Sequence, residues 1–289
     1  MISNLSVNGF TAVPYLETST LMQNHKGALS FSTIKPNVIV GKNGTGKSAL
    51  IETLALRFLA YFTGQSEFDG KYLTNKDSKI WWTKKNKWGD DYAWLNGAVC
   101  KTDNGPALYY RPNHIPGNET GVVHAMMTGY FDEARAYARM TEKKSSGEKS
   151  KALLSGIIEN LSGNNLPSEY KYRNWQFGKN PADLRERYRK CGWVGEDDHQ
   201  AEVLKSVYSP QEGWMPIVLM DEPEQSLDAL AEAELWKAIA NTNCEKVQII
   251  VAAHSLHPIL NKGKYNIIET EPGFMDSICS VMDSTLKSK

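Results

Sequence analysis

The chain has 289 residues, with 33 basic and 33 acidic side chains and a formal net charge of zero. This length allows one large domain or two small ones around a sizeable core. The balanced charge argues against a large nonspecific field for nucleic acid or an anionic membrane. No apolar run approaches the ~18 residues that span a bilayer, and no signal peptide is recognisable. The four cysteines form no C-x-x-C pair, so we expect a cytoplasmic protein with reduced thiols and no membrane partner.

The first half of the chain begins with weakly alternating segments, ISNLSVNGFTAV and GALSFSTI, which predict edge or antiparallel strands. KPNVIV is a short β-branched strand, and SALIETLALRFLAYF has the apolar stripe of a helix with one buried face. From about Gly64 to Gly121 the chain is rich in Gly, Asn, Asp and aromatics. Within it, DYAWLNGAVCKTDNGPALYYRP is typical of a hairpin that turns at residues 103–105.

Helical character follows from about residue 125 to 206, and strands and helices then alternate. MPIVLM is a strand, DALAEAELWKAIANT a helix, and VQIIVAAHS and NIIET are two further strands. This alternation predicts an α/β fold with a mostly parallel core sheet. We expect one unit, in which residues 1–62 and 207–289 form the core lobe. Residues 63–124 would form an aromatic, antiparallel β lobe, and residues 125–206 a helical lobe.

A glycine-rich loop joins strand KPNVIV to the following helix. Gly41, Gly46, Lys47 and Ser48 fit G-x-x-x-x-G-K-[ST] in its strand–loop–helix context, a combination that a chance Gly-rich turn would rarely produce. Such a loop points backbone N–H groups at phosphate oxygens, and the helix adds its positive end. Lys47 would bridge the β- and γ-phosphates, and Ser48 would ligate Mg²⁺. The predicted nucleoside-triphosphate-binding residues are Gly41, Lys42, Asn43, Gly44, Thr45, Gly46, Lys47, Ser48 and Ala49.

Acidic residues end a second apolar strand, in MPIVLMDEPEQSLDAL. A carboxylate there, beside the phosphate loop, suits Mg²⁺, so Asp221 is the predicted second metal ligand. Glu222 follows and would polarise the water that attacks the γ-phosphate. His254 ends another apolar strand. A lone histidine is usually structural, but parallel strands present their C-terminal ends to one ligand edge, so His254 is a second catalytic candidate.

Four motifs in this order resemble the ABC-type P-loop ATPases, a group that includes transporter motors and the SMC-like and RecF-like proteins. GKNGTGKS corresponds to Walker A, IVLMDE to Walker B, and His254 to the switch histidine. SLD corresponds to the D-loop, with Ser226 and Asp228. The resemblance implies ATP and Mg²⁺ as cofactors, with each ATP held between two subunits in a head-to-tail homodimer or higher oligomer.

The same resemblance predicts a signature segment at the start of a helix between Walker A and Walker B. KSSGE fits that place and pattern: Ser145 matches the signature serine, Gly147 the second glycine and Glu148 the last polar residue. Ser146 replaces the first glycine. Together with the N–H groups that begin helix ALLSGIIENL, these residues would contact the γ-phosphate of ATP on the other subunit. The alternative for TEKKSSGEKSK is a flexible, solvated linker.

Within this group, EPEQSLD and AAHSLHPIL resemble motifs of OLD-like ATPases, which are common in anti-phage systems. OLD nucleases carry a C-terminal Toprim nuclease domain, whereas only 29 residues follow Leu260 here, so we expect any effector nuclease to be a separate chain. The resemblance implies an ATPase that controls a partner effector in anti-phage defence or DNA maintenance. The alternatives are an ATP-gated scaffold with slow or no hydrolysis and, less favoured, a transporter nucleotide-binding subunit.

A second candidate surface is KIWWTKKNKWGDDYAWL, where lysines alternate with tryptophans. Such a stretch could stack and neutralise single-stranded nucleic acid, anchor a partner protein, or form an ordinary β lobe with solvated lysines. The interruption by Asp90 and Asp91 favours the last of these. Phe10 and Tyr15 are candidates for adenine stacking, and the sequence identifies no glutamine equivalent to that of the family's Q-loop.

Overall fold

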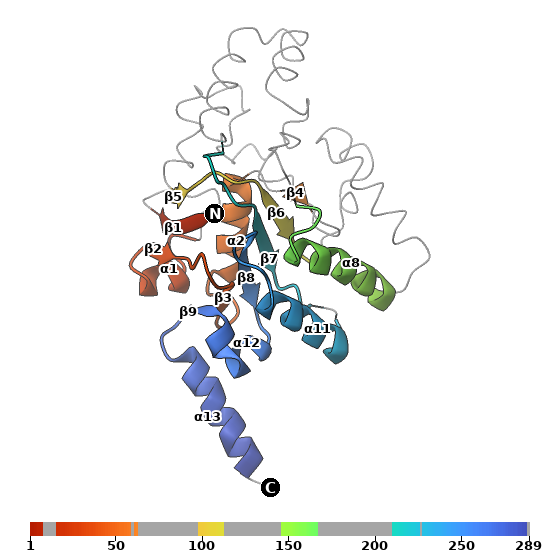
Figure 1. Cartoon of the computed structure of the whole chain (residues 1–289). Helices are drawn as coiled ribbons and strands as arrows, with labels where there is room; N and C mark the ends of the chain where they lie inside the picture. Colours follow the sequence, from red (N-terminus) through yellow and green to blue (C-terminus); the bar gives the residue numbers. More distant parts are fainter. Residues whose placement is uncertain are drawn as a thin grey trace, which may run out of the picture.

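The computed structural model describes residues 1–7, 16–58, 61–62, 98–112, 146–166, 210–225 and 227–287. Its strands form two sheets, one parallel and one antiparallel, with helices packed around the parallel sheet (Figure 1). The fold is therefore mixed α/β, as the alternation of elements predicts.

The parallel sheet has six strands in the order β4-β6-β7-β8-β3-β9, and each neighbouring pair is parallel. Their bounds are β4 (Tyr61–Phe62), β6 (Ala107–Tyr110), β7 (Ile217–Asp221), β8 (Gln248–Ala253), β3 (Asn37–Val40) and β9 (Asn266–Glu269). Every residue of β3, β6, β7 and β8 is buried. Continuous apolar runs such as NVIV and QIIVAA suit this environment, because a central parallel strand is covered on both faces.

Helices cover the parallel sheet. Three helices, α8 (Ser146–Leu161), α11 (Ala229–Ala240) and α12 (His257–Leu260), share one apolar cluster with Met275 of the last helix and with alternate residues of β3, β6, β7 and β8. Trp236 of α11 is central to this cluster and makes an edge-to-face contact with Tyr265 at a centroid distance of 5.9 Å. Outside the cluster, α2 (Lys47–Arg57) contacts β6, β7 and β8. The last helix, α13 (Phe274–Lys287), extends away from the sheet (Figure 1).

The antiparallel sheet has the order β2-β1-β5, with β1 (Ile2–Val7), β2 (Ala28–Ser30) and β5 (Ala98–Thr102). This confirms the prediction of antiparallel strands near the N-terminus. The side chain of Gln248, at the start of β8, joins the two sheets. Its Oε1 accepts from the Ile2 backbone N–H at 2.6 Å, and its Nε2 donates to the Ile2 carbonyl at 2.7 Å. A buried amide thus replaces a pair of backbone hydrogen bonds.

The predicted hairpin across residues 91–112 was wrong for the part that the structure describes, residues 98–112. A turn does lie at residues 103–105, where Gly105 N–H donates to Asp103 Oδ1 at 2.8 Å and Asn104 has a φ of 58°. However, β5 pairs with β1 whereas β6 pairs with β7, so the two strands enter different sheets. The boundary drawn at residue 62 therefore separates β6 from the core sheet to which it belongs.

No helix among the described residues is long and apolar enough to cross a bilayer. Among the described residues, Cys100, Cys244 and Cys279 form no disulfide. The fourth cysteine, Cys191, lies outside the described residues.

Candidate phosphate-binding site

The loop between β3 and α2 is held by its own lysine. Lys47 Nζ donates to the carbonyl oxygens of Gly41 and Lys42, both at 2.8 Å, and Thr45 Oγ1 donates to the Lys42 carbonyl at 2.8 Å. Lys47 is only 4% exposed. Burial lowers its pKa, while Glu222, then Asp221 and Glu224, oppose the shift. A buried ammonium with acceptors only from the loop is available to exchange them for phosphate oxygens.

Two glycines of the loop are required by close packing. A Cβ at Gly41 would lie 1.7 Å from Thr270 Oγ1, and one at Gly46 would lie 2.5 Å from Ser19 Cβ. Gly46 also has a φ of +105°, which side chains rarely adopt. Ser19 caps the short helix α1 (Thr20–Asn24), and Leu21 N–H donates to the Thr45 carbonyl at 3.0 Å. The α1 segment therefore supports the phosphate loop from one side.

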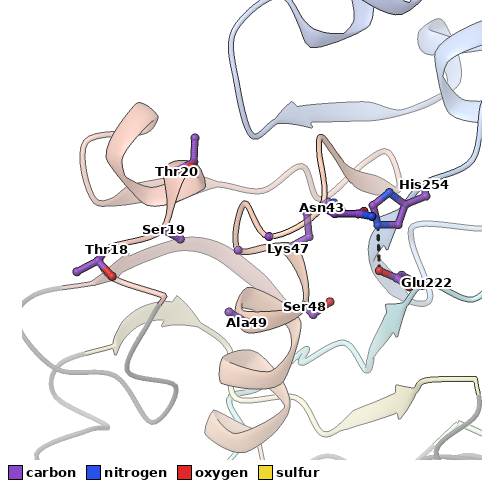
Figure 2. A pocket seen from close by; sticks show the side chains of 11 residues that line it. Thr18, Ser19, Thr20, Asn43, Lys47, Ser48, Ala49, Glu222 and His254 are labelled. Carbon is purple, nitrogen blue, oxygen red and sulfur yellow. Dashed lines mark hydrogen bonds and ion pairs between the residues drawn. The ribbon is translucent and has the colours of Figure 1, made fainter.

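A pocket of about 740 Å³ opens above the loop. Figure 2 shows Thr18, Ser19 and Thr20 on one side of Lys47, and Glu222 with His254 on the other. Of the predicted nucleotide ligands, the following line this pocket: Asn43, Gly44, Gly46, Lys47, Ser48 and Ala49. Gly41, Lys42 and Thr45 belong to the loop but not to the lining. The three hydroxyl residues of the α1 segment were missed in the sequence, because their position depends on how α1 packs.

Asp221 ends β7 beside the pocket. It is completely buried, and neither carboxylate oxygen has a hydrogen-bond partner. Burial raises its pKa to about 6, against the opposing charge of Arg111. A buried carboxylate with unsatisfied oxygens near the Ser48 hydroxyl fits a hard cation such as Mg²⁺. Among the described residues no group of three His, Cys, Asp or Glu side chains could hold a metal by itself. Phosphate oxygens would have to complete such a coordination shell.

Glu222 and His254 meet at the carboxyl ends of adjacent strands. Glu222 Oε1 lies 3.0 Å from His254 Nε2 (dashed line in Figure 2). Glu222 has a φ of 49°, a left-handed conformation that is strained for a residue with a side chain. Its backbone N–H donates to the Ala252 carbonyl of β8 at 2.8 Å, which holds this turn against the neighbouring strand. The prediction that His254 and the acidic strand end share one edge is consistent with this geometry.

Glu224 holds the backbone at His254 in place. Its Oε1 accepts from the His254 backbone N–H at 2.6 Å, while its Oε2 is buried without a hydrogen-bond partner. Burial raises the pKa of Glu224 to about 7. Glu224 therefore positions the histidine segment, a role that the sequence analysis did not assign to it.

Arg111, which follows β6 directly, is a further residue that the sequence analysis missed. Its Nη1 lies 2.7 Å from Glu52 Oε1, and its Nε lies 3.3 Å from Asp221 Oδ2. The sequence signal that could have identified Arg111 was its position, as a charged residue directly after the apolar strand ALYY. Because that strand was assigned to a hairpin, its end was not expected at the ligand edge.

The predicted signature segment lies where α8 begins. The helix starts at Ser146, six residues earlier than the segment ALLSGIIENL predicted, so Gly147 and Glu148 belong to its first turn. Glu148 stabilises this turn through the helix dipole, and by the same electrostatics it opposes an anion there. None of these residues lines the pocket of its own phosphate loop.

Asp228 of the predicted D-loop caps α11, accepting from Ala231 N–H at 2.9 Å. That hydrogen bond lowers the pKa of Asp228. Lys151 of α8 lies 3.6 Å from its other oxygen, so the D-loop and the start of α8 are neighbours. Ser145, Ser226, Phe10, Tyr15 and the lysine–tryptophan segment lie outside the described residues.

Comparisons with protein-family models and with curated proteins find no match to this sequence.

Proposed function

We propose that this protein is a Mg²⁺-dependent ATPase of the ABC type that resembles the OLD-like group. The observation that carries the proposal is the position of three chemical groups at one sheet edge. The phosphate loop follows β3, the Asp221–Glu222 pair lies at the end of β7, and His254 follows β8, which lies between β3 and β7. Parallel strands bind ligands at this edge, where the connections diverge.

Each residue has a role in the proposed hydrolysis. Lys47 and the loop N–H groups bind the β- and γ-phosphates, while Ser48 and Asp221 would hold Mg²⁺, which would neutralise charge on those phosphates. Glu222 accepts a proton from water as the water oxygen bonds to the γ-phosphorus. The bond to the bridging oxygen breaks, and ADP leaves with phosphate. His254 Nε2 lies within hydrogen-bonding distance of Glu222 Oε1 and would face the γ-phosphate.

The proposal extends to assembly. An ATP-bound head-to-tail dimer would bring the α8 N-terminus and Asp228 of one chain to the nucleotide of the other, and would control a separate effector protein, such as a nuclease, in the cytoplasm. The closeness of Lys151 to Asp228 supports this, since it puts both predicted trans elements on one side of the chain.

Two substitutions test binding and turnover separately. Lys47→Ala should abolish ATP binding measured by calorimetry with Mg²⁺, because the buried ammonium offsets phosphate charge. Glu222→Gln should bind ATP like the wild type but release phosphate ~10²-fold more slowly, as expected when a positioned base is lost. Wild-type affinity in Lys47→Ala would contradict the binding site. Binding without turnover in the wild type would favour the ATP-gated scaffold.

A further inference from the structure

We propose that Arg111 is a positioning residue that holds the Asp221 carboxylate in the orientation in which it ligates Mg²⁺. This inference rests on the proposed function and concerns the same site. Arg111 does not line the pocket above the phosphate loop. It would act through Asp221 rather than by touching nucleotide.

The position of Arg111 follows from the sheet. Strands β6 and β7 are parallel, and Tyr110 pairs with Met220, so Arg111 and Asp221 are the next residues along the two strands. The side chains of Arg111 and Asp221 therefore start from neighbouring positions on adjacent strands. Arg111 Nε approaches Asp221 Oδ2 to 3.3 Å. Besides the Ser48 hydroxyl, which helps to lower the pKa of Asp221, the Arg111 guanidinium is the group that constrains this buried carboxylate.

The guanidinium is itself anchored at its other end. Arg111 Nη1 lies 2.7 Å from Oε1 of Glu52, whose side chain is 13% exposed. Glu52 follows Ser48 by four residues on α2, so both side chains lie on the same face of that helix. The chain Glu52–Arg111–Asp221 therefore connects the helix that carries one predicted Mg²⁺ ligand to the strand that carries the other. Arginine suits this role because its planar fork fixes two acceptors at once.

A purely structural alternative is that Arg111 only neutralises the charge of Glu52, whose side chain is mostly buried. The double variant Arg111→Gln/Glu52→Gln separates the two roles. It removes the charge pair without leaving either partner alone, so stability should recover. The Asp221 carboxylate still lacks its constraint, so the effect on Mg²⁺ should remain.

The experiment measures binding of the non-hydrolysable analogue AMP-PNP by calorimetry, with Mg²⁺ and with EDTA. The wild type should bind at least ~10-fold more tightly with Mg²⁺. Arg111→Gln should match the affinity of the wild type in EDTA. It should lose most of the gain, that is, of the increase in AMP-PNP affinity that Mg²⁺ gives the wild type. Arg111→Lys should recover part of it, and Glu52→Gln should keep it. The double variant should melt near the wild-type temperature and still lack the gain.

Three outcomes would overturn the inference. A full Mg²⁺ gain in folded Arg111→Gln would show that Asp221 needs no partner. Recovery of the gain in the double variant would show that Arg111 serves only to neutralise Glu52. If the wild type bound AMP-PNP under neither condition, the proposed function would fail together with the inference, whereas the first two outcomes leave the proposed function intact.

Discussion

Asp221 shows how a proposed metal ligand can cost stability. Its carboxylate is completely buried, and its only charged neighbour within reach of an ion pair is Arg111 among the described residues. Burial raises its pKa from 3.8 to about 6. The native state therefore favours the protonated form more than the unfolded chain does. Protonation of Asp221 therefore adds to the free energy of unfolding. This contribution is complete below about pH 4 and is lost as the pH rises through about 6.

Asp221→Asn should accordingly stabilise the nucleotide-free protein at pH 8 by about 1–3 kcal/mol, since a difference of 1 in pKa corresponds to ~1.4 kcal/mol. The gain should disappear near pH 4, and the variant should lose Mg²⁺-dependent ATP binding. Urea denaturation at several pH values measures the effect, with the exposed Asp283→Asn as a control. A variant that is equally destabilised at every pH would contradict the assigned cause.

Among the elements, the phosphate loop and α1 depend on each other. Gly46 faces Ser19, whose hydroxyl caps α1 by accepting from Met22 N–H at 3.3 Å and donates to the Leu16 carbonyl at 2.6 Å. The far end of α1 contacts the end of β9, where Asn24 Nδ2 donates to the Thr270 carbonyl at 2.8 Å. Thr270 in turn leaves no room for a Cβ at Gly41. The loop is therefore held from both ends.

Gly46→Ala should lower the free energy of unfolding by about 1–3 kcal/mol, the typical cost of one strained backbone conformation, and should abolish ATP binding. Gly156→Ala is a matched control, because Gly156 lies in α8 with nothing within 4 Å of an added Cβ. It should stabilise by up to ~1 kcal/mol and leave binding unchanged. Adding Ser19→Gly to Gly46→Ala should restore part of the stability by removing the contact. If stability did not recover, the whole loss in Gly46→Ala would be due to backbone strain.

At the scale of the whole molecule, the start of α8 and the pocket are separate features of one chain. Lys151, in the second turn of α8, lies next to Asp228, while the pocket lies over α2 with Glu222 and His254 on its edge. In the proposed head-to-tail dimer, one chain supplies the pocket and the other supplies the start of α8.

Sedimentation of Glu222→Gln protein with ATP tests this arrangement. ATP should dimerise it, and adding Ser145→Arg should weaken the dimer by at least ~10-fold, because a bulky cation would fill the space of the trans γ-phosphate. ATP binding by each subunit should stay within a few-fold of the parent. Mixing Ser145→Arg with Lys47→Ala chains should restore one composite site per dimer. Equal dimerisation of both proteins would return residues 141–151 to the role of a linker.

Local sequence was sufficient for features that depend on neighbours along the chain. The glycine spacing before Lys47 determines a loop between a strand and a helix, and the apolar runs that end in Asp221 and His254 determine buried strands. Antiparallel strands near the N-terminus were also predictable from alternation. In each case the signal lies within about a dozen residues, which is the range over which periodicity and turn chemistry act.

Strand partnership was decided only by the tertiary structure. Alternation in residues 98–110 predicts strands, but backbone hydrogen bonds carry no residue identity, so it does not say that β5 pairs with β1 and β6 with β7. That choice brings Arg111, which was assigned to the aromatic β lobe, next to Asp221, 110 positions further along the chain. It arises from burying β3, β6, β7 and β8 in one sheet, which no local pattern records. The contact between Ser19 and Gly46 depends instead on how α1 packs against the phosphate loop.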